Sequence, residues 1–181
     1  MPDQHTYNRV VNGLKARGKK HVEILTLLQF DWPVSRFVLE KLSEHISDQI
    51  IADEQPVIYE IIEQALVSYS HAIHHGSQKK MSDAARFAVF MESLITETSR
   101  TMEIEIRDEQ GSGWTIDSSI SFNEWYSKRN GEISIYPKLH TDEKSLRSTL
   151  YELLTSETIR NVLRRIDYED AVVDGRLGFR S

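Results

Sequence analysis

The hydrophobic pattern of this chain changes its period once, near residue 102, and this change limits the fold more than any other feature. Before that point, apolar residues recur every three to four positions, which is the spacing of one helix face. From there on, Met102, Ile104 and Ile106 alternate with charged residues, as in a half-buried strand. Long helices followed by a short sheet define the α+β class. We therefore predict an α+β fold that is mostly α-helical.

Five helices are predicted before the sheet, and residues that favour helix ends mark their limits. Gly18 follows the first apolar stripe, and glycine is common just after a helix. Proline is tolerated in a first helical turn and disfavours helix in the residue before it, so Pro33 and Pro56 each open a helix. Ser82 is a suitable N-cap for the fifth helix. The expected helices span about 4–17, 22–30, 33–50 and 56–76, and a fifth begins at Ser82 and includes residues 84–95.

Three strands are predicted between about residues 102 and 136. Two glycines within 108–113 indicate a turn after the first strand. Asn130-Gly131 is the strongest hairpin signal, because both residues tolerate the positive φ of tight hairpin turns. Strands joined by short turns most simply form an antiparallel meander with one face covered by helices. The expected strands are 102–107, 114–122 and 133–135.

The remaining chain is predicted to form two helices and a tail. The first is capped by Thr141 or Asp142, and a break near Thr155-Ser156 separates it from the second. The tail, residues 167–181, has enough apolar residues to dock on this chain or on a partner. We expect a helical region over 1–78 and an α+β region over 79–181, which together form one compact unit.

Composition excludes several classes of protein. The 181 residues include no cysteine, which rules out disulfides, thiolate metal sites and cysteine nucleophiles. No secretory signal pattern and no apolar run of about 20 residues is present, so we expect a soluble, cytoplasmic protein without a membrane partner. Glycine-rich phosphate loops, dinucleotide fingerprints and nucleophile elbows are also missing. We therefore expect no cofactor and lean away from an enzyme.

A basic segment at the start of the chain is one candidate binding site. Residues 4–22 carry cations and no acid, whereas the whole chain has a formal net charge of −6. Such clusters often meet phosphates or another partner, and the alternative is a basic helix end that is simply solvated. The candidate residues are Lys15, Arg17, Lys19 and Lys20.

A histidine cluster on the fourth predicted helix is a candidate metal site. His71 precedes His74 and His75 by three and four residues, a spacing at which imidazoles on one helix can share a metal ion. The alternative is a solvated helix end, where the helix dipole favours protonated histidine.

Aromatic residues near the predicted sheet are a candidate protein-binding surface. Trp125 and Tyr126 belong to a group that either packs in the core or anchors an interface. Because strong catalytic motifs are lacking, our leading hypothesis is a non-enzymatic interaction or regulatory protein. Its expected partner is another protein, and a homo-oligomer is an alternative. The alternatives are a nucleic-acid-binding protein that uses the basic segment and a metal-dependent enzyme that uses the histidines.

Overall fold

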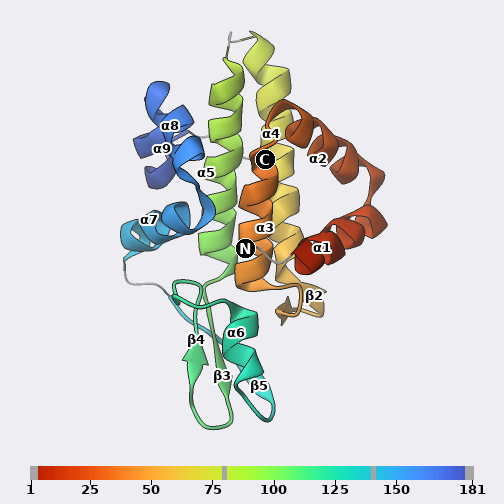
Figure 1. Ribbon diagram of the computed structural model, residues 1–181, viewed down its shortest axis with the longest axis vertical. Helices are drawn as coiled ribbons and strands as arrows, with labels where there is room; N and C mark the ends of the chain where they lie inside the picture. Colours follow the sequence, from red (N-terminus) through yellow and green to blue (C-terminus); the bar gives the residue numbers. More distant parts are fainter. Residues whose placement is uncertain (1–3, 79–80, 140–141, 178–181) are drawn as a thin grey trace.

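Two long helices form the centre of the molecule. The computed structural model describes residues 4–78, 81–139 and 142–177, and Figure 1 shows α4 (Val57–Gln78) and α5 (Asp83–Thr101) side by side along the long axis. On one side lie α1 (Gln4–Arg17) and α2 (Lys19–Asp31), and α3 (Ser35–Ile46) lies in the middle of this view. On the other lie α7 (Glu143–Leu154), α8 (Glu157–Arg165) and α9 (Glu169–Asp174). A small antiparallel sheet completes the fold, so the predicted mostly helical α+β class is confirmed.

The central helices follow the pattern that their residues predict. The Ser82 hydroxyl accepts a hydrogen bond from the Ala85 N–H at 3.1 Å, which confirms Ser82 as the N-cap of α5. Most residues of α5 are buried, as expected for a helix that is apolar on more than one face. Trp32 stacks on Phe87 with ring centroids 4.9 Å apart, and this contact joins the turn after α2 to α5.

The third predicted helix is shorter than expected. It stops at Ile46 because Ser47 has a φ of 69°, outside the helical region. A small hairpin of β1 (Ile51–Ala52) and β2 (Gln55–Pro56) follows, and the sequence did not reveal it. Its turn places Asp53 and Glu54 at φ values of 48° and 64°, without the glycine that normally marks such a turn.

The sheet contains the expected number of strands in an order that differs from a meander. β3 (Ile104–Asp108) lies between β4 (Gly113–Trp114) and β5 (Ile133–Pro137), and both pairings are antiparallel. One face carries Trp114 into the core against Phe122, with ring centroids 5.6 Å apart. On the opposite face, the Arg107 guanidinium lies over the Tyr136 ring at 5.1 Å.

The predicted strand over residues 114–122 is wrong beyond Trp114. The chain turns because the Trp114 indole N–H donates to the Ile120 carbonyl at 3.0 Å, and α6 (Phe122–Ser127) then begins after Ser121. The Ser121 hydroxyl caps α6 by accepting from the Glu124 N–H. Asn130-Gly131 therefore connects α6 to β5 and is not a strand-to-strand hairpin. Of that pair only Gly131 has a positive φ, 114°.

A buried polar network fixes α9, which lies in the segment predicted to be a docking tail. Arg147 of α7 donates to the carbonyls of Val172 and Val173 at 3.0 and 2.5 Å, and these carbonyls are near the C-terminal end of α9. It also donates to Thr96 Oγ1 at 2.8 Å and lies 4.0 Å from the Glu92 carboxylate, both on α5. The chain thus docks this segment on itself. Within the described residues, no helix is long and apolar enough to span a membrane.

Candidate functional site

The basic segment is divided by its contacts. Arg17 donates to Glu63 Oε2 at 3.3 Å and to Gln55 Oε1 at 3.0 Å, and its guanidinium lies 5.5 Å from the centre of the Tyr59 ring. This hydrogen bond to Glu63 raises the pKa of Arg17. Arg17 therefore joins the end of α1 to the start of α4 as a structural contact.

The three lysines of this segment are more exposed. Lys15 is exposed on α1, and Lys19 lies 3.8 Å from Glu23 one turn further along α2. Lys20 forms part of the wall of a cavity between α2 and α4. Of the four candidate cations, Arg17 and Lys19 thus lie close to carboxylates of this chain.

The candidate aromatic pair is split between core and surface. Trp125 is only 3% exposed, its ring lies 6.0 Å from that of Phe122, and its indole N–H donates to Ser112 Oγ at 3.4 Å. Tyr126 stacks on the same Phe122 ring but is partly exposed. Trp125 therefore stabilises the core under α6, and of the two only Tyr126 reaches the surface.

The candidate metal ligands His71 and His74 are both exposed on α4. No group of three potential ligands of the His, Cys, Asp or Glu type is present in the described part of the chain. The side chain of His75 lies outside the described residues. The described side chains therefore give the metal-enzyme alternative no geometric support.

Another histidine, His45, is buried and belongs to the core. Its Nε2 lies 2.7 Å from the Ile116 carbonyl oxygen, and its ring centroid lies 5.5 Å from that of Trp114. Burial lowers the pKa of His45, so the neutral ring donates its Nε2–H to this carbonyl. The bond ties α3 to the loop after β4, and it explains why a polar side chain is tolerated there.

The cavity between α2 and α4 brings together two candidates from different parts of the sequence. Its volume is about 270 Å³, and Lys20 of the basic segment and His74 of the histidine cluster both line it. The other lining residues are mostly apolar: Glu23, Ile24, Leu27, Ser70 and Ile73. We call this feature the α2–α4 cleft.

Two large apolar side chains continue the cleft along α2. Leu27, which lines the cleft, is 43% exposed, and Phe30, one turn later, is 83% exposed. Residues three apart lie on the same side of a helix, so Ile24, Leu27 and Phe30 form one ridge, the α2 ridge. Ile24 is buried, as are Leu25 and Leu28 on the neighbouring side, so the exposed part of the ridge is Leu27 and Phe30.

The sequence contains a local signal for this ridge that is neither a charged nor an aromatic motif. The segment EILTLLQF is apolar on two sides of the helix, and only the side with Leu25 and Leu28 was needed to explain a core contact. The second apolar side, with Ile24, Leu27 and Phe30, had no assigned neighbour.

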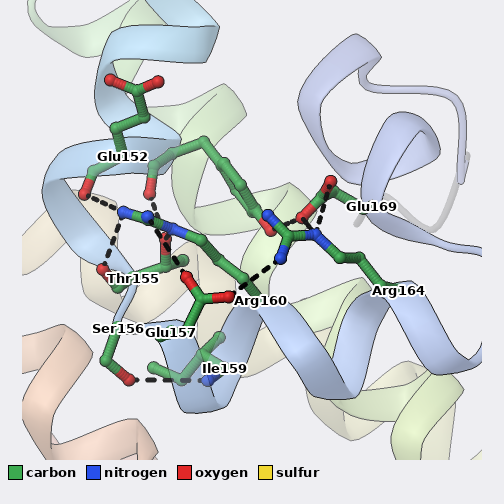
Figure 2. Close-up of polar contacts among 9 residues, drawn as sticks. Glu152, Thr155, Ser156, Glu157, Ile159, Arg160, Arg164 and Glu169 are labelled. Carbon is green, nitrogen blue, oxygen red and sulfur yellow. Dashed lines mark hydrogen bonds and ion pairs between the residues drawn. The ribbon is translucent and has the colours of Figure 1, made fainter.

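A second cavity, of about 480 Å³, lies among α7, α8 and α9, but the protein itself holds the arginines at its wall. Figure 2 shows that Arg160 donates to the carbonyls of Glu152 and Thr155, at 3.0 and 3.2 Å, and so caps the end of α7. Arg164 bridges Glu157 and Glu169, with 3.0 Å to each carboxylate. These contacts stabilise the helix junction, and we do not assign a ligand to this cavity.

Comparisons with known proteins supply no relative, because no family profile, no curated protein and no solved structure matches this chain. The α2–α4 cleft with the α2 ridge is therefore the candidate functional site on the strength of its geometry.

Proposed function

We propose that the protein is a non-enzymatic interaction protein that binds a helical segment of a protein partner along the α2–α4 cleft. The observation that carries the proposal is the exposure of Leu27 and Phe30 beside an apolar cavity. When a partner covers exposed apolar surface, each Å² removed from water contributes about 25 cal/mol of favourable free energy. Aromatic and aliphatic side chains next to a cleft are typical anchors of protein interfaces.

The shape of the site favours a helix as the bound element. Both walls are helices, and the α2 ridge repeats every three residues over about 9 Å of helix length. Side chains spaced by three and four residues on a partner helix insert between such ridges. An amphipathic helix would thus cover Leu27 and Phe30 and fill the cavity above Ile73.

The charges around the cleft favour an acidic partner. Lys20 lies at the N-terminal end of α2, where the helix dipole is positive, and no acidic residue occupies the first turn of this helix. Within the described residues, no carboxylate forms an ion pair with Lys20. A partner with Asp or Glu beyond its apolar stripe would complement this end and bind faster at low salt.

The nucleic-acid alternative has less support than the protein-partner reading. Arg17 is held by Glu63 and Lys19 lies near Glu23, so two of the four candidate cations already face carboxylates. A duplex binder needs several cations on one continuous face.

The test is a selection of helical peptides from a displayed library with randomised apolar and charged positions. We expect enriched peptides to share an apolar stripe at helical spacing with Asp or Glu at one end. Replacing both Leu27→Ser and Phe30→Ser should weaken their binding by about tenfold or more, because each anchor contributes about 1 kcal/mol or more when buried. Fluorescence anisotropy against each variant measures this loss.

A matched control uses Leu139→Ser, since Leu139 is another highly exposed leucine and lies outside α2 and α4. This variant should bind the selected peptides as the unchanged protein does. Lys20→Glu should weaken acidic peptides and favour versions in which the acids are changed to lysine. Enriched peptides that ignore the α2 substitutions, or that respond equally to Leu139→Ser, would contradict the proposed site.

A further inference from the structure

The outer edge of the sheet is a second surface without a neighbouring strand in the described structure. β5 pairs with β3 on one side only, and Figure 1 shows it at the border of the sheet. Its Ile135 and Tyr136 are 39% and 45% exposed. This surface is separate from the α2–α4 cleft.

The backbone of β5 offers hydrogen-bonding groups along this open edge. The Lys138 N–H donates to the Glu103 carbonyl at 2.9 Å, which fixes the residues that bond toward β3. Bonded pairs alternate along an antiparallel ladder, so Ser134 and Tyr136 also point their backbone groups toward β3. Ile133 and Ile135 therefore turn their N–H and C=O groups to the open side, where Pro137 has no N–H to offer.

The two charged residues that flank β5 would form opposite-charge pairs between two copies of the strand paired antiparallel. Glu132 precedes the strand and Lys138 follows it, with Ile135 midway between them. When two copies pair antiparallel about Ile135, Glu132 of each copy lies opposite Lys138 of the other, on the same face of the sheet. Neither side chain forms an ion pair within the described part of the chain.

We propose that a second copy of this chain occupies the edge, and that the protein forms a two-fold symmetric dimer through β5. Ile135 then lies opposite its own copy, and Ser134 lies opposite Tyr136 of the other copy. The arrangement closes at two copies, because the other outer strand, β4, has only two residues. The dimer does not depend on what binds the α2–α4 cleft.

Sedimentation equilibrium of the full chain tests the dimer. Glu132→Lys and Lys138→Glu should each lower the association constant about tenfold or more, because each creates two pairs of like charges. The double variant Glu132→Lys/Lys138→Glu restores both opposite-charge pairs and should dimerise again. Mixing the two single variants should likewise produce a heterodimer.

The register is tested by engineered disulfides, which are simple to read because the chain has no cysteine of its own. Ser134→Cys and Tyr136→Cys should cross-link when the two variants are mixed under mild oxidation, and neither should cross-link alone. Circular dichroism of each variant checks that it remains folded.

Three results would overturn this proposal. One is a monomer at all concentrations up to about 0.5 mM, well above the range of stable dimers. Another is a dimer that keeps its affinity in both single charge variants. The last is a dimer that Leu27→Ser and Phe30→Ser dissociate, which would place the second copy in the α2–α4 cleft.

Discussion

We predict that Arg147 contributes strongly to the packing stability of the C-terminal helices. It is buried, it makes three hydrogen bonds to Thr96, Val172 and Val173, and it lies 4.0 Å from the fully buried Glu92. Arg147→Met keeps a long flexible chain that suits a helix but removes the charge and all the donors. Because the Val172 and Val173 carbonyls then lose a buried donor and the Glu92 carboxylate loses a cation 4.0 Å away, the free energy of unfolding should fall by about 3–5 kcal/mol.

Urea denaturation followed by circular dichroism measures this loss. For a protein of this size, it corresponds to a drop of about 6–20 °C in Tm, at about 2–4 °C per kcal/mol. The second variant, Glu92→Leu in the Arg147→Met background, removes the remaining charge. Since a buried ion pair exchanged for apolar side chains is often neutral, the double variant should recover part of the stability.

Two results would refute this reasoning. A loss of less than about 1 kcal/mol for Arg147→Met would show that the buried pair contributes no more than an exposed one. A double variant that is less stable than Arg147→Met alone would show that Glu92 is satisfied without Arg147.

Three further changes test other contacts. The pKa of His45 in the folded protein lies below its ordinary value of 6.5, so the contribution of His45 to stability is complete above about pH 6.5 and declines as the pH falls toward the folded-state pKa. Urea unfolding between pH 7.5 and 5 should therefore show a smaller loss of stability with falling pH in His45→Gln than in the unchanged protein. Gly13→Ala should destabilise the protein by about 1–3 kcal/mol because the new Cβ would overlap the Tyr59 hydroxyl. In a Tyr59→Ala background, the same Gly13→Ala change should instead stabilise the protein, because alanine favours helix more than glycine does, and thermal unfolding measures both effects. Ser82→Ala should cost about 1 kcal/mol by removing the cap on Ala85, measured by urea unfolding against Ser119→Ala as an exposed control.

The helices were largely predictable because their signals are local. Apolar spacing, Ser82 and Ser156 as caps and the glycine after α1 each act within a few residues, and the structure confirms these assignments. Glycine inside a helix is normally destabilising, but Gly13 of α1 lies against Tyr59, which is distant in sequence. The structure explains this glycine by a close approach of α4 that no local pattern reveals.

The sheet was less predictable because alternation does not specify hydrogen-bond partners. Trp114, Ile116, Ile120 and Phe122 follow the period of a strand, yet Ile116 and Ile120 supply carbonyls to His45 and to Trp114. The His45 and Trp114 side chains thus bond to carbonyls that would have paired with a neighbouring strand, and the Ser121 hydroxyl then caps the start of a helix.

The candidate site was only partly predictable for a related reason. Lys20 and His74 were singled out from separate local patterns, whereas the cleft that joins them results from packing of α2 against α4. Trp125 was also singled out from a local pattern, but it is buried in the core. An aromatic residue next to a sheet has the same sequence pattern in a core and at an interface, so the sequence could not distinguish the two.

The most direct test of the binding cleft is a map of backbone amide signals by ¹H–¹⁵N NMR during titration with a selected acidic helical peptide. We expect the largest shifts at Ile24, Leu27 and Phe30 on α2 and at Ile73 on α4, with β5 unchanged. Shifts concentrated on the sheet or on α7–α9, with α2 unaffected, would contradict it.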